Sequence, residues 1–177
     1  CKVAPRCDLF AVSNANTDKC WLFSTRTGGL LRTVDLPFSG AELAFNPTGG
    51  VLAAVGGNET VNACLTIDVP SGEITDALQA RGEGEGVGAV FTQEGSQLAV
   101  ANSSGEAFFF SLRTGGCRRA LKGSHMQTCA NSCAYSPDGK YVVTNAKGLP
   151  PTARVMSART GEFQHEIALE GWEATHF

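Results

Sequence analysis

Short apolar runs separated by tight turns recur at a fixed interval along this chain. Three turns follow an aromatic residue and carry glycine at the same place: 45–50 (FNPTGG), 91–96 (FTQEGS) and 135–140 (YSPDGK). In each case an alternating apolar run ends at the aromatic residue and another follows the turn, which predicts a strand, a turn and a strand. The glycines at 49, 95 and 139 lie 46 and 44 residues apart.

A second series of turns has the same period, half a repeat away. It is marked by Gly28, Gly72, Gly115 and Gly161, each after Thr or Ser, with separations of 44, 43 and 46 residues. A period of roughly 40–45 residues with several short strands per unit is typical of a β-propeller blade. We therefore predict an all-β fold, a β-propeller of four-stranded antiparallel blades.

The runs between the turns give the predicted strands. They are Leu9–Ser13, Cys20–Ser24, Leu30–Leu36, Ala41–Asn46, Val51–Val55, Ala63–Val69, Glu73–Leu78, Gly88–Thr92, Gln97–Ala101, Ala107–Leu112, Cys117–Lys122, Ser132–Ser136, Tyr141–Asn145, Ala153–Ser157 and Glu162–Leu169. The runs that begin at Val51, Gln97 and Tyr141 are apolar on both faces, as expected of central strands buried between neighbouring blades.

The best-preserved unit runs from Leu121 to Gly161. It contains Ser124-His125, then the turn 135–140 (YSPDGK), then the segment 153–161 (ARVMSARTG). In this order of features the unit resembles the repeat of the WD-repeat family, and the resemblance covers essentially the whole chain. The resemblance implies a β-propeller that acts as an interaction platform for other proteins.

The chain also departs from the family pattern. The Gly-His pair of the family survives only as Ser124-His125, and Ser104 stands where an aspartate would accept a hydrogen bond. We therefore expect the family's buried His-Ser-Asp-Trp hydrogen-bond network to be absent. The positions of the family's Trp-Asp pair hold Phe23-Ser24, Ile67-Asp68, Phe110-Ser111 and Met156-Ser157.

The repeats divide residues 1–177 as a partial propeller. We assign a blade part to 1–29, repeats to 30–72, 73–116 and 117–161, and the start of a next blade to 162–177. Most propellers have four to eight blades, and this length gives about four. Because the phasing begins within a blade, we expect an incomplete ring or fragment; a self-contained four-bladed ring is the alternative.

Composition and charge narrow the possible partners. The chain is 42% hydrophobic and 18% charged with 21 glycines, which fits an all-β domain rich in turns. No stretch approaches 18 consecutive apolar residues, so we expect no membrane span. Binding to phosphate backbones needs clustered Lys and Arg. The net charge is −3 and the nearest basic cluster, Arg118-Arg119 with Lys122, fits a solvated strand edge, so we expect no nucleic acid.

Seven cysteines are spread over the chain, and Cys64 and Cys133 lie inside apolar runs. This pattern suggests free buried thiols in a reducing compartment, and hence the cytoplasm. Cys129 and Cys133 could form half a metal site with His125. Zinc needs four ligands, however, and no second cysteine pair is near, so we predict no metal and no cofactor.

Propeller enzymes are the alternative to a scaffold. Lactonase-like propellers gather carboxylates and histidines around a metal in the central channel, whereas this chain has only His125, His165 and His176. The turn 158–162 (ARTGE) resembles that of quinone-cofactor propellers but lacks their following tryptophan. An enzyme of the quinoprotein or lactonase type would need residues from blades not present here. We therefore predict a non-enzymatic scaffold.

Loops on one rim of the propeller are the candidate contact surface, because binding residues concentrate on loops of a rigid scaffold. The candidate residues for contact with other proteins, of unknown identity, are Arg81, Glu83, Glu85, His125, Met126 and Lys147.

Two further expectations concern the turns and the ends of the array. Gly139 and Gly161 should have positive φ angles in their hairpins. In a fragment, the first hairpin and the last blade would expose apolar faces, so we expect the isolated chain to aggregate or fold poorly. A stable monomer that binds no hydrophobic dye would favour the closed four-bladed ring.

Overall fold

The computed structural model describes residues 1–58, 61–79, 86–103, 106–121, 129–136, 138–147 and 152–168. These residues form sixteen strands in four antiparallel sheets and contain no helix. The first sheet comprises β1 (Lys2–Val3), β2 (Leu9–Ser13), β3 (Lys19–Ser24) and β4 (Leu30–Asp35). The second comprises β5 (Glu42–Phe45), β6 (Val51–Asn58), β7 (Val61–Asp68) and β8 (Ile74–Gln79). The third comprises β9 (Gly86–Phe91), β10 (Gln97–Asn102), β11 (Ala107–Ser111) and β12 (Cys117–Leu121). The fourth comprises β13 (Cys129–Tyr135), β14 (Tyr141–Lys147), β15 (Thr152–Ser157) and β16 (Phe163–Ala168).

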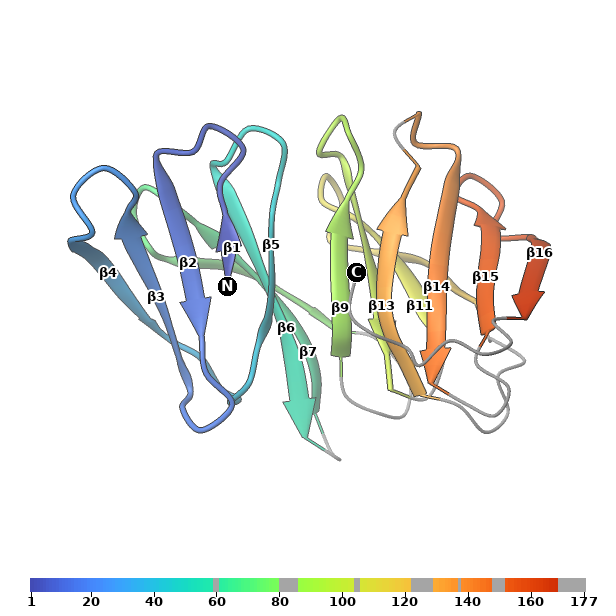
Figure 1. Cartoon of the computed structure of the whole chain (residues 1–177), viewed down its shortest axis with the longest axis horizontal. Helices are drawn as coiled ribbons and strands as arrows, with labels where there is room; N and C mark the ends of the chain where they lie inside the picture. Colours follow the sequence, from blue (N-terminus) through green and yellow to red (C-terminus); the bar gives the residue numbers. More distant parts are fainter. Residues whose placement is uncertain are drawn as a thin grey trace.

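The four sheets stand side by side, from the first on the left to the fourth on the right of Figure 1. Within each sheet the strands follow chain order. The first sheet contacts the second through β1, β2 and β5, the second contacts the third chiefly through β5, β6 and β9, and the third contacts the fourth through β9, β10 and β13. This is the arrangement of consecutive propeller blades, so the predicted fold class is confirmed.

Central strands are buried on both faces. Leu52 and Ala53 in β6 are both fully buried although neighbouring side chains of a strand point to opposite sides. Leu52 belongs to the core shared with the first sheet, and Ala53 to the core shared with the third. The both-face apolar pattern of this run therefore arises because a sheet covers each side.

Tight turns with a left-handed residue gather on one rim, the upper one in Figure 1. Gly139 and Gly161 have φ of 68° and 72°, which confirms the expectation for both. The Gly139 amide donates to the Ser136 carbonyl at 2.8 Å, and the Gly161 amide to the Ser157 carbonyl at 2.7 Å. The left-handed residues in these turns are Cys7, Gly28, Gly49, Gly72, Gly95, Gly115, Gly139 and Gly161; Gly40, with φ of 70°, lies in the connection between β4 and β5.

One strand, β1, was not predicted from the sequence. It has only two residues, and the following turn holds Cys7, with φ of 57°, where the corresponding turns hold glycine. Lys2 and Val3 pair with β2, so the segment 1–29 joins β4 in a complete four-stranded sheet. At the other end, β16 pairs with β15 in the fourth sheet. The sheets are offset by one strand from the predicted repeats. Each predicted repeat begins with an outer strand, which belongs to the preceding sheet in the structure.

Candidate functional site

Most of the predicted contact residues lie outside the described residues. These are Arg81, Glu83, Glu85, His125 and Met126. Lys147 is the last residue of β14, and its side chain is not among those described. Of the half metal site that was considered and set aside, His125 lies outside the described residues and the Cys129 side chain is not described. No group of three or more His, Cys, Asp and Glu in the described part of the chain is placed to hold a metal ion.

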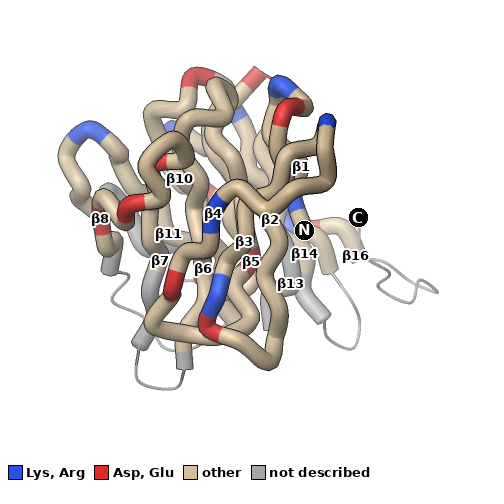
Figure 2. The backbone as a smooth tube through the Cα atoms, turned by 90° about the vertical axis from the view of Figure 1, so that its left-hand side faces the viewer, with Lys and Arg blue, Asp and Glu red and all other residues tan. Residues whose placement is uncertain are grey.

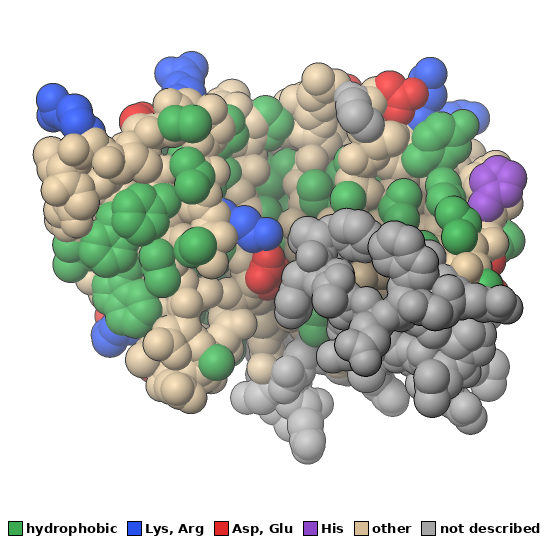
Figure 3. Space-filling model, in the orientation of Figure 1, with side chains coloured by type: hydrophobic (Ala, Val, Ile, Leu, Met, Phe, Trp, Pro, Cys, Tyr) green, Lys and Arg blue, Asp and Glu red, His purple; other side chains and the backbone are tan. Residues whose placement is uncertain are grey.

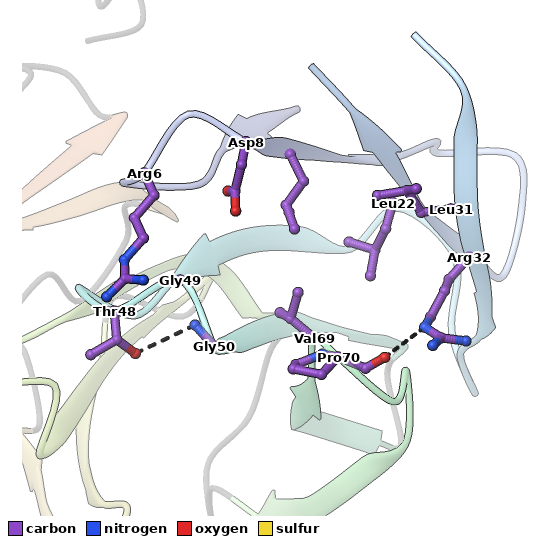
Figure 4. A pocket seen from close by; sticks show the side chains of 11 residues that line it. Arg6, Asp8, Leu22, Leu31, Arg32, Thr48, Gly49, Gly50, Val69 and Pro70 are labelled. Carbon is purple, nitrogen blue, oxygen red and sulfur yellow. Dashed lines mark hydrogen bonds between the residues drawn. The ribbon is translucent and has the colours of Figure 1, made fainter. Parts of the chain in front are cut away.

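A pocket opens on the rim that carries the tight turns, at the seam between the first and second sheets (Figure 4). Its volume is about 420 Å³. Four turns or strand ends contribute to it, because the β1–β2, β5–β6 and β7–β8 turns and the start of β4 meet there. The lining residues are Arg6, Asp8, Leu9, Leu22, Leu31, Arg32, Thr48, Gly49, Gly50, Val69 and Pro70.

The base of the pocket is apolar. Leu22 is 1% exposed and Val69 is 7% exposed, and both belong to the core between the first two sheets. Leu31, in contrast, is 54% exposed and stands at the wall. β4 is paired to β3 with a register shift between Leu22 and Phe23, which gives the outer strand one extra residue at this point. A ligand in this pocket would therefore contact an apolar floor and one exposed leucine.

Charged side chains surround this floor. Arg32 donates from Nε to the Pro70 carbonyl at 2.9 Å, which fixes β4 of the first sheet to the β7–β8 turn of the second. Arg6 and Asp8 come from the β1–β2 turn and are exposed, and Figure 4 shows the Arg6 side chain extending toward Thr48. Two arginines and one aspartate leave the pocket with an excess of positive charge.

The walls are held by backbone contacts of the turns. The Val69 amide donates to the Gly50 carbonyl at 3.0 Å, and the Gly50 amide donates to the Thr48 hydroxyl at 3.4 Å. Beside the pocket, hydrogen bonds from the Ser71 hydroxyl and amide to Asp68 lower the pKa of that carboxyl, with a smaller contribution from the Arg32 charge. The hydrogen bonds among Thr48, Gly50 and Val69 thus hold together the turns that line the pocket.

The buried thiols Cys20 and Cys64 in the described part of the chain are poor nucleophiles. Burial raises the pKa of Cys20 to about 11 and that of Cys64 to about 12, so both remain protonated at neutral pH. Both are free and buried, as expected for Cys64, whereas Cys1, Cys7 and Cys117 are exposed. Cys133 is a free thiol too, but it is only partly buried. Helices long and apolar enough to cross a membrane do not occur among the described residues.

Sequence reasoning did not identify the pocket, because its members come from five separate places in the chain. The only local signals are the glycine turn at Gly49-Gly50 and the two leucines that begin β4. Neither indicates that Arg6 and Arg32 flank one apolar floor.

Comparisons with known proteins bear on the fold. No family model matches the chain, and no curated protein matches it in sequence. Among solved structures, the chain is similar to Kuenenia stuttgartiensis hydrazine synthase, with a TM-score of 0.85 and 16% sequence identity. The match covers 94% of this chain and 47% of that one, so this chain spans about half the length of the matched structure. At this identity the likeness shows the fold: four antiparallel sheets arranged as in a β-propeller.

Proposed function

We propose that this protein is a non-enzymatic β-propeller scaffold that binds other proteins, with the pocket between the first two sheets as one contact site. The observation that carries the proposal is the composition of this pocket. Two arginines border a pocket on the turn-rich rim that has an apolar floor and the exposed Leu31 at its wall. Arginine side chains donate charge-assisted hydrogen bonds to carboxylates, and loops on a rigid scaffold are common contact sites.

The partner that fits is an acidic segment of another protein in which Asp or Glu stands beside a large apolar residue. The apolar side chain would lie over the floor and pack against Leu31, which is 54% exposed, and the carboxylate would face Arg6. A chain with a net charge of −3 gives no general attraction to acidic partners. Recognition would thus depend on this local pair of arginines, and the same net charge disfavours nucleic acid.

Binding of short peptides tests the proposal. Fluorescent peptides that contain Leu-Asp or Leu-Glu would be titrated with the wild-type chain and with Arg6→Glu. Loss of a hydrogen bond to a charged group weakens binding about tenfold or more. Arg113→Glu, at an exposed turn of the third sheet, is the matched control and should leave affinity unchanged.

Two results would count against this pocket as a protein-binding site. One is an affinity that Arg6→Glu does not change. The other is equal binding of the same peptides with Asn or Gln in place of the acid.

The alternative function is an enzyme of the quinoprotein or lactonase type, with active-site residues elsewhere. Measuring metal and quinone in the purified protein separates the two functions, because a stoichiometric cofactor contradicts the scaffold proposal. We also propose a cytoplasmic location, since the free thiols of Cys20 and Cys64 are buried in the cores between sheets.

A further inference from the structure

The β1–β2 turn, which brings Arg6 to the pocket, differs from the corresponding turns of the other three sheets. Its left-handed residue is Cys7, with φ of 57°, where the other three turns have glycine. Its first residue is Ala4, which has no side-chain acceptor, whereas the corresponding residue of each other sheet accepts an amide N–H of its turn. This turn therefore has a less favourable backbone conformation and less side-chain support than its counterparts.

Arg6 stands at a position that stabilises the turn in two other sheets. There the Thr48 hydroxyl accepts the Gly50 amide at 3.4 Å, and Asp138 accepts the Lys140 amide at 3.1 Å. An arginine side chain has only donors, so Arg6 cannot accept such a bond. It also takes part in none of the ion pairs found among the described residues. A turn that gives up local stability and presents an unpaired charge to a pocket is typical of a binding site.

Arg32 approaches the pocket from the other side. Its Nε donates to the Pro70 carbonyl at 2.9 Å, and its Cδ would lie 2.8 Å from a Cβ on Gly72, so its stem rests on the β7–β8 turn. Figure 2, which faces the first sheet, shows charges mainly at strand ends and turns; Arg32 is the only Lys or Arg of β4. No ion pair to Arg32 occurs among the described residues. Its two terminal NH₂ groups, with four donors, are thus available to an acid.

The apolar floor lies between the two arginines. Across Figure 4 the labelled side chains follow the order Arg6, Asp8, Leu22 and Arg32. The Asp8 carboxylate disfavours a second acid in the middle of the pocket, because like charges repel at close range. On the face seen in Figure 3, the described part of this rim carries separate basic and acidic side chains and no continuous basic surface. The pocket therefore suits acids at its two ends and an apolar side chain between them.

Strand spacing gives the distance between these ends. Arg6 belongs to the turn between β1 and β2, and Arg32 belongs to β4, the last strand of the same sheet. Adjacent strands lie about 4.8 Å apart, so two to three spacings separate the two backbones by about 10–14 Å. An extended peptide rises about 3.3 Å per residue, so residues i and i+4 are about 13 Å apart. Their side chains and that of residue i+2 point to the same side.

We propose that the pocket binds an extended segment of another protein with the pattern acid-x-apolar-x-acid. Arg6 binds one acid, Arg32 binds the other, and the apolar side chain lies over the floor against Leu31. Pairs of guanidinium and carboxylate are strong, directional contacts. This inference rests on the proposed function of the pocket and adds to it a second acid, a second contact residue and a spacing.

Peptides of one composition test the spacing. Fluorescence polarisation would compare a peptide with the core Asp-Ser-Leu-Ser-Asp with one whose core is Ser-Asp-Leu-Asp-Ser. The two have equal charge, but an acid directly next to leucine points to the other side of an extended segment. We expect the first peptide to bind about tenfold more tightly, as for one additional charged hydrogen bond. Equal affinities would overturn the proposed spacing.

Peptides with one acid test the role of each arginine. Their cores are Asp-Ser-Leu-Ser-Asn and Asn-Ser-Leu-Ser-Asp, and each is titrated with the wild-type chain, Arg6→Gln and Arg32→Gln. One peptide should weaken about tenfold with Arg6→Gln only, and the other with Arg32→Gln only. A merely structural role of Arg32, through its bond to Pro70, would weaken both peptides alike and would overturn the proposal.

Controls separate failure of this inference from failure of the proposed function. If both one-acid peptides depend on Arg6 and neither on Arg32, the pocket is still a protein-binding site but the two-acid pattern is wrong. If Arg6→Gln affects no peptide, the proposed function itself is wrong. Arg113→Gln, at an exposed turn of the third sheet, should leave every affinity unchanged.

A conservative variant guards against a disturbed fold. Arg32→Lys keeps the positive charge but cannot form the same bond to Pro70. It should retain more affinity for the Arg32-dependent peptide than Arg32→Gln does, and melting transitions establish that both variants are folded. An equal loss in the two variants would mean that the charge of Arg32 does not bind the peptide, which would overturn the proposal.

Discussion

In three of the four sheets, a single side chain stabilises the turn that joins the first two strands. In three sheets, a side-chain oxygen at the start of the turn accepts the amide N–H of the residue five positions later. The acceptors are Asn46, Thr92 and Ser136, and the donors are Val51, Gln97 and Tyr141, at 3.0, 3.1 and 3.0 Å. The first sheet has Ala4 at this position, where only the backbone bond from its amide to the Leu9 carbonyl, at 2.9 Å, is available. The turns thus share one backbone shape with different side-chain support.

The left-handed position of this turn predicts the effect of a substitution at Gly139. A Cβ at Gly139 would meet nothing within 4 Å, so the effect of Gly139→Val comes from the backbone conformation alone. We expect a loss of about 1–3 kcal/mol in the free energy of unfolding, measured by denaturant titration. Gly139→Asn is the control, since asparagine tolerates this conformation, and it should be less destabilising. Equal stability of the valine variant and the wild type would contradict the turn assignment.

A carboxylate in the same turn predicts a dependence of stability on pH. The Ser136 hydroxyl donates to Asp138 at 2.6 Å and the Lys140 amide donates to it at 3.1 Å; these bonds lower the pKa of Asp138 from 3.8 to about 2. Because the pKa is lower in the folded chain than in the unfolded one, the stabilisation is present above about pH 4 and is lost as the pH falls toward 2. The melting temperature of Asp138→Asn should therefore fall less between pH 4 and pH 2 than that of the wild type. Identical pH profiles would show that Asp138 is not held in this way.

At the scale of elements, glycines allow close packing against strand β6. Gly56 of β6 lies against the connection between β4 and β5, and Gly86 of β9 lies against β6. Phe38 lies in this connection, is 6% exposed and belongs to the first core. A Cβ on Gly56 would lie 2.5 Å from the Phe38 ring, and a Cβ on Gly86 in β9 would lie 2.2 Å from the Val55 side chain. Both glycines therefore serve close packing between elements, and neither needs a left-handed backbone.

This contact predicts that Gly56→Ala destabilises the chain by overpacking. We expect a loss of about 1–3 kcal/mol in the free energy of unfolding, measured by urea titration. Gly50→Ala is the matched control: its new Cβ would lie 3.5 Å from the nearest atom, and it should change stability little. Adding Phe38→Leu to Gly56→Ala should recover part of the loss. A neutral Gly56→Ala would mean that the Phe38 ring moves aside without penalty.

At the scale of the whole molecule, the row of sheets leaves an apolar face open at each end. The pair Phe10 and Phe23 on the first sheet, and the pair Val143 and Val155 on the fourth, occupy positions that are buried elsewhere in the row. Contiguous apolar patches of this kind are uncommon on soluble monomers and mark interaction surfaces. The expected tendency of the isolated chain to aggregate stays a prediction.

Size-exclusion chromatography and dye binding of the isolated chain test this prediction. We expect a hydrophobic dye to bind the wild-type chain and the chain to elute as more than one species, because apolar faces are open to solvent. Phe23→Asp places a charge on one of these faces and should reduce dye binding. A monodisperse monomer that binds no dye would contradict the prediction and would favour the closed four-bladed ring.

The sequence by itself determined the period, the strands from β2 to β16 and the turn geometry of Gly139 and Gly161. These features are local: alternation of apolar residues defines a strand, and a glycine at a fixed place defines a turn. The sequence did not predict strand β1, because the strand is two residues long and its turn has Cys7 in place of glycine.

Only the tertiary structure decided which face of each sheet is covered and where a pocket forms. Arg6, Arg32 and Val69 are far apart in the chain and meet because the first sheet packs on the second. The sequence pattern of Phe10 and Leu52 is alike, yet one is partly exposed and the other fully buried. The reason is physical: hydrophobic periodicity records that a face is apolar, whereas burial depends on whether another sheet lies against it.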